Sequence, residues 1–176
     1  MGTCPLIQLR TRLKAENYMP LLNKVFGKKS SSEPLIKIGS QYGGGIVFYV
    51  DHTGQHGLIA AKSDMEGSSP GIAAMKGLSE GLFNWPDAIA ACRKSETGGF
   101  RDWILPDKEQ LNHLFMHKRE VGGFVHDSAN YWSSSECPDG GGWIKAGFWI
   151  KDFSSFGCQS AEPKDAYNRV RAIRAF

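Results

Sequence analysis

The strongest structural signal in the chain is Gly43-Gly44-Gly45-Ile46-Val47-Phe48-Tyr49-Val50-Asp51-His52-Thr53-Gly54-Gln55-His56-Gly57-Leu58-Ile59-Ala60-Ala61. Residues 46–50 are β-branched, aromatic or apolar strand formers, and a second apolar run occupies residues 58–61. The segment between them contains Asp51 and Gly54, which favour turns. Two strand signals separated by turn chemistry predict a β-hairpin.

Two helices are predicted after the hairpin. Residues 62–81 are rich in Gly, Ser and Lys and show no clear period, so we expect a long loop there. The first helix is expected to begin after an Asn84 cap and to run to about Lys94. The second is expected to begin after Asp107, which can form a capping box with Gln110. Its predicted buried stripe consists of Leu111, Leu114 and Phe115.

The last third of the chain is predicted to form short strands. Beyond Gly123, the residues Tyr, Trp, Ser, Gly and Phe recur in short runs. A final strand is expected over residues 169–176, with Val170, Ala172 and either Ile173 or Phe176 as its apolar residues and arginines on the open face. One hairpin, two helices and several short strands with irregular loops together predict an α+β fold.

Length and charge divide the chain into two parts. Its 176 residues suit one domain plus an extension. Residues 1–34 have a local charge of +4 and two short helical patterns, which predict a basic N-terminal helical arm and linker. Residues 35–176 carry a charge of −1 and are expected to form the ligand-binding domain. Because this domain has no Lys/Arg stripe, nucleic acid is not expected as a partner.

The sequence shows no sign of a membrane span, a secretory leader or a bound cofactor. No apolar stretch approaches the roughly 20 residues that cross a bilayer, and the first thirty residues lack the apolar core of a signal peptide. No CxxC pair suggests a zinc ribbon, and no cofactor is expected. Cys137 and Cys158 have two interpretations, a disulfide that closes one loop or a pair of free thiols.

Several separated segments together resemble one known family. The chain is similar to the domain family named for the C-terminal domain of a bacterial collagen-like adhesin (Lcl C-terminal). The resemblance covers residues 38–176 and implies a C-type-lectin-like fold with two helices, small antiparallel sheets and long irregular loops. The matching blocks are Ile38-Gly39 with Tyr42-Gly43-Gly44-Gly45-Ile46-Val47-Phe48-Tyr49-Val50-Asp51, Gly54-Gln55-His56-Gly57-Leu58-Ile59-Ala60-Ala61, Gly99-Phe100-Arg101-Asp102-Trp103-Ile104-Leu105-Pro106, Tyr131-Trp132-Ser133-Ser134-Ser135-Glu136 and Arg169-Val170-Arg171-Ala172-Ile173-Arg174.

The region from Glu136 to Tyr167 has the composition of an adaptable binding surface. It is rich in aromatic residues, Gly and Ser, and rigid rings give contact area at low entropy cost while Gly and Ser let the backbone conform. We expect Trp132, Trp143 and Phe148 to be buried, and at least two of Trp149, Phe153 and Phe156 to be exposed. The predicted ligand-binding residues, within about 137–160 and at Tyr167, are Asp139, Ile144, Ala146, Phe148, Trp149, Ile150, Asp152, Phe153, Ser155, Phe156 and Tyr167.

Other residues have competing interpretations. We assign Trp85 and Trp103 to the core because each adjoins a helix cap. The arginines of the last block either form an anion site for a sulfated glycan or pair with carboxylates. Glu162-Pro163-Lys164 is similar to the Glu-Pro-Asn triplet of calcium-dependent C-type lectins, but Lys164 places an ammonium where an oxygen ligand is needed. We therefore do not expect a calcium site.

One metal-dependent alternative remains open. His113 and His117 are four residues apart with Glu109 one turn earlier, so all three share a helix face that suits a metal ion. The same pattern also describes the solvated side of an amphipathic helix. No P-loop, dinucleotide fingerprint or Gly-x-Ser-x-Gly motif occurs. We therefore do not expect an enzyme.

These observations predict a non-enzymatic binding module for a macromolecular ligand. The resemblance implies two forms of it: the variable protein of a diversity-generating retroelement, which we favour, and a fixed glycan-binding adhesin of the glycosaminoglycan-binding kind. The variable form is favoured because the segment before the last strand contains residues that adenine-targeted changes make from Asn codons. Either form implies a protein or glycan ligand, display at a cell or virion surface and homo-oligomers that raise avidity.

Overall fold

The computed structural model describes residues 36–73, 81–125, 129–139, 146–154 and 156–176. The chain divides into two compact units, Met1–Pro34 and Leu35–Phe176. The predicted helical arm lies outside the described residues, so it stays a prediction. The second unit contains helices and two small antiparallel sheets, which confirms the predicted α+β class.

The first sheet contains the predicted hairpin. Its strands β1 (Gln41–Tyr42), β2 (Gly45–Val50), β3 (Gly57–Ala60) and β7 (Ile173–Ala175) are antiparallel and follow the order β1-β2-β3-β7. In the hairpin, Ile46 pairs with Ala60 and Val50 with Gly57. A Cβ atom on Gly45 would lie 2.1 Å from the carbonyl oxygen of Ala60, so this strand has to begin with glycine.

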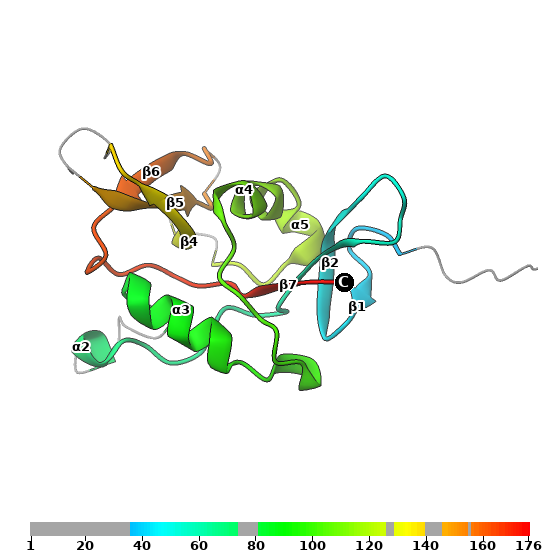
Figure 1. The fold of residues 1–176 in the computed structure, drawn as a ribbon, viewed down its shortest axis with the longest axis horizontal. Helices are drawn as coiled ribbons and strands as arrows, with labels where there is room; N and C mark the ends of the chain where they lie inside the picture. The colour runs from blue at the N-terminus through cyan, green and yellow to red at the C-terminus, as the bar shows by residue number, and fades with distance from the viewer. Residues whose placement is uncertain (1–35, 74–80, 126–128, 140–145, 155) are drawn as a thin grey trace, which may run out of the picture. The chain divides into compact units, whose positions relative to one another are not determined.

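The second sheet lies at the other side of this unit (Figure 1). It consists of β4 (Asn130–Cys137), β5 (Gly147–Asp152) and β6 (Gln159–Glu162), antiparallel in the order β4-β5-β6. The β4–β5 register shifts between Trp132 and Glu136, which is a bulge-like irregularity. These strands hold most of the predicted ligand-binding residues.

Both predicted helices and their caps are confirmed. In α3 (Trp85–Lys94), Asn84 accepts a 2.9 Å hydrogen bond from the Asp87 amide. In α4 (Lys108–Met116), Asp107 and Gln110 form the full capping box. The short helices α2 (Pro70–Ala73) and α5 (Lys118–Val121) and the 3₁₀ turn η1 (Thr97–Gly99) complete the described helical structure. The prediction of a long loop over 62–81 was therefore wrong at α2. None of the described helices is long and apolar enough to cross a bilayer.

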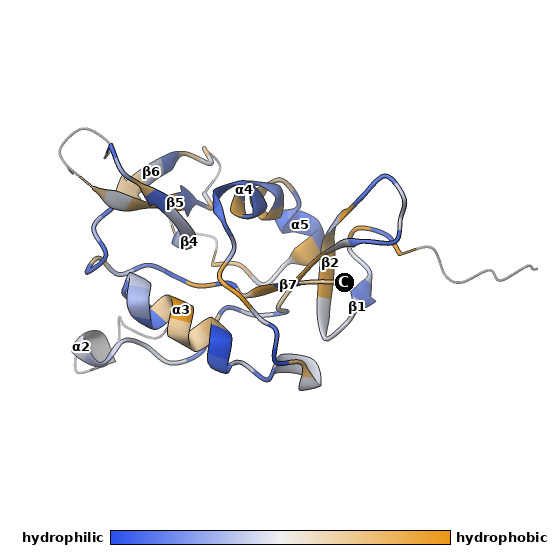
Figure 2. Ribbon diagram, in the orientation of Figure 1, coloured by the Kyte–Doolittle hydropathy of each residue, from blue (hydrophilic) through white to orange (hydrophobic). Residues whose placement is uncertain are grey.

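The C-terminal segment runs between α3 and α4 (Figure 1) and separates two hydrophobic cores. Apolar residues gather on β2, on β7 and along α3 (Figure 2). Side chains alternate between the cores along β2, β3, the start of β4 and the C-terminal segment, as the period of two requires. The first core contains Val47, Ile59, Trp103, Trp132, Ile150, Val170 and Ala172. The second contains Phe48, Ala60, Leu111, Leu114, Tyr131, Phe153 and Ile173. Both faces of these strands are thus buried.

This arrangement corrects the prediction that the arginines of the last strand face solvent. Arg171 follows Val170 and points to the opposite side, where the second core and the α5 loop cover it, so it is only 1% exposed. A strand buried on both faces has no open face. Arg174 is half-buried and forms a two-pronged ion pair with Asp102 at 2.7 and 2.9 Å.

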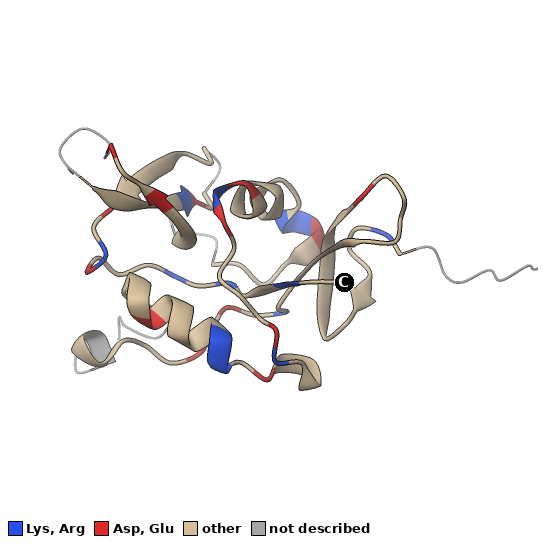
Figure 3. Cartoon of the chain, in the orientation of Figure 1, with Lys and Arg blue, Asp and Glu red and all other residues tan. Residues whose placement is uncertain are grey.

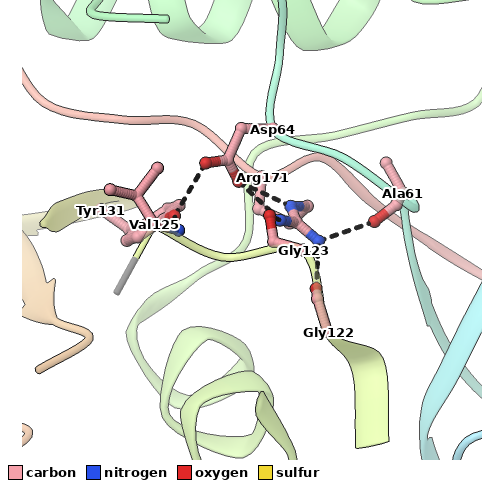
Figure 4. A network of polar contacts seen from close by, with 7 residues as sticks. All are labelled: Ala61, Asp64, Gly122, Gly123, Val125, Tyr131 and Arg171. Atoms are coloured by element: carbon pink, nitrogen blue, oxygen red, sulfur yellow. Dashed lines mark hydrogen bonds and ion pairs between the residues drawn. The ribbon is translucent and has the colours of Figure 1, made fainter. Parts of the chain in front are cut away.

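Arg171 joins the segment after β3 to the loop after α5 (Figure 4). Its guanidinium donates to Asp64 at 2.8 Å from Nε and lies 2.7 Å from the same oxygen through Nη2. The remaining N–H groups donate to the carbonyl oxygens of Ala61, Gly122 and Gly123 at 3.0, 3.2 and 2.6 Å. A guanidinium has five N–H donors, so this buried cation is fully satisfied.

Asp64 extends the network to β4. Its second carboxylate oxygen accepts a 2.8 Å hydrogen bond from the Tyr131 hydroxyl, which in turn accepts from the Val125 amide at 3.2 Å. Burial raises the pKa of Tyr131 above its ordinary value, and the Asp64 carboxylate adds to the shift. The phenol therefore stays protonated and continues to donate. The network links the end of the first sheet to the start of the second.

Away from this network, acidic and basic residues are interspersed over the surface elements (Figure 3). Pairing with carboxylates, one of the two interpretations of the arginine block, is confirmed for Arg171 and Arg174. Arg169 has no ion pair with the part of the chain that the structure describes. Neither paired arginine is free to bind a sulfated glycan.

An aromatic cluster corrects a second prediction. Phe153 is only 3% exposed, and its ring centroid lies 4.4 Å from that of Tyr131, 4.8 Å from Phe124 and 5.5 Å from Phe115. Trp149 is half-buried, so Phe156 is the only member of the predicted trio in the exposed class. The expectation that at least two of the three are exposed was therefore wrong. The rings that pack against Phe153 lie in α4, in the loop after α5 and in β4, all distant in sequence.

Replacement of Asp64 by Ala should lower the free energy of unfolding by about 3–5 kcal/mol, because it leaves the Arg171 guanidinium buried without a counter-charge. Chemical denaturation measures the change. The control is Glu96→Ala, which removes an exposed ion pair with Arg101 and should hardly alter stability. Equal effects of the two variants would show that the buried network does not stabilise the fold.

Replacement of Phe153 by Ala should cost about 3–5 kcal/mol, because it leaves a cavity among packed rings. Phe156→Ala should change the free energy of unfolding by less than about 0.5 kcal/mol, because that side chain is exposed. Thermal and urea unfolding of both variants compare the two positions. A Phe153→Ala protein as stable as the wild type would contradict the burial of this ring.

Candidate functional site

A hollow of about 480 Å³ lies at the end of the second sheet where β4 ends and β5 begins. We call it the tip hollow. At this end Cys137 pairs with Gly147, and a Cβ atom on Gly147 would lie 2.8 Å from the carbonyl oxygen of Glu162. Glycine therefore lets β5 and β6 approach closely here. The residues that line the hollow are Glu136, Pro138, Ala146, Gly147, Phe148, Pro163, Lys164 and Asp165.

Trp85 holds the walls of the tip hollow together. Its ring stacks on Phe148 with centroids 3.8 Å apart and an angle of 26° between the planes. Its Nε1 donates to the carbonyl oxygen of Ser133 in β4 at 3.0 Å, and its amide donates to the carbonyl oxygen of Lys164 at 2.9 Å. One residue at the start of α3 thus fixes β4, β5 and the 163–165 segment. The hollow is preformed rather than assembled by a ligand.

The chemistry of the tip hollow suits recognition of a mixed surface. Pro138, Ala146, Phe148 and Pro163 provide apolar area. The exposed residues Glu136, Lys164 and Asp165 add charges of both signs. Apolar walls with a few polar groups are typical of binding hollows. The predicted residues Ala146 and Phe148 both line it, and Asp139 is exposed directly after the end of β4.

The other predicted ligand-binding residues do not join this hollow. Trp149 points to the opposite face of β5, where the Lys108 ammonium lies 3.7 Å from its ring centroid. Asp152 accepts hydrogen bonds from the amide and the hydroxyl of Ser154, so it stabilises a local turn. Phe156 is exposed beyond that turn, and Tyr167 lines a separate hollow of about 260 Å³ with Asn130 and Arg169.

Two of the predicted residues are not on the surface, and others lie outside the described part of the chain. Ile150 is buried in the first core and Phe153 in the second, because strand β5 is covered on both faces. Their assignment to the ligand-binding surface was wrong. Ile144, Ser155 and Trp143 lie outside the described residues, so their roles stay predictions.

The structure also shows residues that sequence reasoning did not assign to the site. Trp85 packs against the first core as predicted, yet it is half-buried and supports the tip hollow. Glu136, Pro138, Pro163 and Asp165 come from segments that meet only in the folded chain. The only sign of these four residues in the local sequence was a proline next to charged residues. Phe148 was expected to be buried and is half-buried instead, while Trp103 and Trp132 are buried as predicted.

The α4 histidines are the alternative site that the sequence suggested for a metal ion. His113 is exposed, and its ring lies 5.1 Å from that of Tyr49, whereas His117 forms the end of α4. Among the described residues, no group of three or more His, Cys, Asp or Glu side chains is placed to hold a metal ion. The Glu162 carboxylate, part of the lectin-like triplet, accepts a 2.7 Å hydrogen bond from the Asn168 amide.

The cysteines in the described part of the chain are free thiols. Cys137 is buried and Cys158 is exposed, so the free-thiol interpretation of this pair holds in the structure. Burial raises the pKa of the Cys92 thiol to about 12. A thiol in this state is protonated and unreactive at neutral pH, which fits its place in the first core.

Comparison with known proteins adds no identity to this geometry. The chain matches no protein-family model, and a search among curated proteins finds no relative.

Proposed function

We propose that residues 35–176 form a non-enzymatic binding module that presents the tip hollow and its surroundings to a macromolecular ligand. The observation that carries the proposal is the stacked pair of Trp85 and Phe148, which holds an apolar hollow open at the end of a small sheet. A preformed hollow binds without the entropy cost of ordering its walls. The sequence resemblance to the Lcl C-terminal family supports a C-type-lectin-like frame for this display.

Within this proposal, the module is the variable protein of a diversity-generating retroelement, displayed at a cell or virion surface. Such a protein needs a frame that tolerates change at the binding residues. Ala146 and Asp139 are exposed at strand ends, whereas Trp85, Trp132 and Gly147 support the frame. Substitution at the first two therefore leaves the packing intact, which supports diversification at these positions.

The fixed glycosaminoglycan-binding adhesin has less support. That function needs exposed cationic side chains, and the arginine block was its main candidate. Arg171 is buried with Asp64, and Arg174 is paired with Asp102. Arg169 alone of the three has no ion pair with the described residues. Within the arginine block, a single guanidinium provides too little charge to recognise a polyanion.

Replacement of Ala146 by Arg should abolish ligand capture, because the longer side chain fills the tip hollow. The full chain is applied to protein arrays and glycan arrays, and spots that bind the wild type should lose about tenfold or more in signal with the variant. Ala175→Arg is the matched control, since it adds the same side chain at an exposed position of β7. Ala146→Arg binding at wild-type strength, with an unchanged melting temperature, would exclude the tip hollow as the binding site.

Sequencing of this gene across its source population separates the variable protein from a fixed binder. Substitutions should concentrate at a constant set of codons between Ser135 and Asn168, including those of Asp139 and Ala146. The codons of Trp132 and Gly147 should stay unchanged, because these residues support the sheet. A uniform stretch across the population would contradict diversification and leave a fixed binding module.

A further inference from the structure

A second and larger hollow lies at the opposite end of β5 from the tip hollow. It has a volume of about 830 Å³ and lies between the end of α4, the helix α5 with its following loop, and residues 153–154. We call it the α5 groove. Its floor contains the rings of Phe115, Phe124 and Phe153, with Phe153 at 4.8 and 5.5 Å from the other two.

Two cations hold the walls of the α5 groove in place. The Lys118 ammonium donates to the carbonyl oxygens of Phe153 and Ser154, both at 2.8 Å. On the other wall, Arg171 holds the carbonyl groups of Gly122 and Gly123. The groove is therefore fixed before any partner arrives, which lowers the entropy cost of binding.

Exposed apolar side chains surround this groove. Met116 and Val125 line it, and both side chains are exposed, Met116 to 67%. Phe156 follows the Ser154 turn and is 88% exposed. The residue after it, Gly157, packs directly against the Phe115 ring. Large apolar side chains grouped around a hollow mark interaction surfaces in soluble proteins.

The charge near the groove is positive. Lys118 and Lys151 lie 4.3 and 4.5 Å from the Phe115 ring centroid, and no carboxylate of the described residues forms an ion pair with either. Burial lowers the pKa of Lys151, Cys158 and the Asp152 carboxylate oppose the shift, and the Lys118 ammonium adds to it. Arg119 adds an exposed cation to the lining.

Two carboxylates lie near these cations. Glu120 also lines the groove, and its Cβ lies close to Gly39 at the outer side of α5. The Asp152 carboxylate accepts hydrogen bonds from the amide and hydroxyl of Ser154 and acts on Lys151. The cations Lys118, Arg119 and Lys151 exceed these two carboxylates by one charge, so an incoming negative charge is favoured here.

We infer that the α5 groove binds a segment of a partner protein in which an apolar side chain stands next to a carboxylate. The apolar side chain lies in the groove against Phe115, Met116 and Val125, above the packed rings of Phe124 and Phe153. Burial of this apolar area gives most of the affinity. The carboxylate meets Arg119 and the remaining N–H of Lys118 at the rim. This surface is separate from the tip hollow, so the chain has two binding surfaces at opposite ends of one strand.

The test is selection of random 12-residue peptides displayed on phage against the full 176-residue chain. Enriched peptides should combine Phe, Trp or Leu with Asp or Glu. The affinity of the best synthetic peptide, measured by fluorescence polarisation, should fall about tenfold or more with Arg119→Glu and with Met116→Asp. It should also fall with added salt, because exposed charges contribute.

Two controls separate this inference from the proposed function. Arg93→Glu reverses an exposed charge on α3 and should leave peptide affinity unchanged. Ala146→Arg blocks the tip hollow and should also leave it unchanged. Conversely, Arg119→Glu should not affect the array ligands that Ala146→Arg abolishes. Each surface can then fail without the other.

Four outcomes would overturn the inference. The first is the absence of enriched peptides, and the second is enrichment of basic peptides or of peptides insensitive to Arg119→Glu. The third is that vesicles of phosphatidylcholine and phosphatidylserine bind through Met116 while peptides do not, which makes the groove a membrane contact. The fourth is a dimer in light scattering that Met116→Asp converts to monomer, which makes a second copy of the chain its occupant.

Discussion

The buried guanidinium of Arg171 is the interaction on which the arrangement of this domain depends. Its five donor contacts reach the segment after β3, the loop after α5 and Asp64, and Asp64 continues to Tyr131 in β4. These segments are distant in sequence, and the guanidinium adds the loop after α5 to the strand contacts of β3 with β7 and of Tyr131 with Arg169. A buried cation is costly unless every donor is satisfied, so the network requires all of them to be in place at once.

The same network holds one wall of the α5 groove in place, and a separate residue does so at the tip hollow. Arg171 holds Gly122 and Gly123 at one wall of the α5 groove, and its guanidinium lies 4.0 Å from the Phe124 ring centroid in the floor. At the far end of β5, Trp85 has an equivalent role through one ring stack and two hydrogen bonds. In both places a large, fully bonded side chain fixes the backbone around an open apolar surface. Preformed surfaces of this kind lower the entropy cost of binding a partner.

Strand β5 connects these two surfaces and shows how a short element serves several purposes. Phe148 lies at the tip hollow, Ile150 lies in the first core, and Trp149 and Lys151 face α4 under Lys108 and Asn112. The chain then turns at Asp152 and places Phe153 in the second core. Aromatic richness in this region therefore reflects packing as much as recognition. Composition alone does not separate the two.

The sequence by itself determined the elements whose signals are local. Contacts within a few residues determine the hairpin around Asp51 and Gly54, the Asn84 cap and the Asp107–Gln110 capping box. These elements together predict the α+β class. Only the tertiary structure decided which aromatic rings are exposed and that Arg171 is buried. A period of two shows which residues share a face of a strand, but it does not show whether that face is exposed to solvent. Here distant segments cover both faces. For the same reason Phe153 lies in the core, although it is an aromatic residue next to a turn and was predicted to bind a ligand.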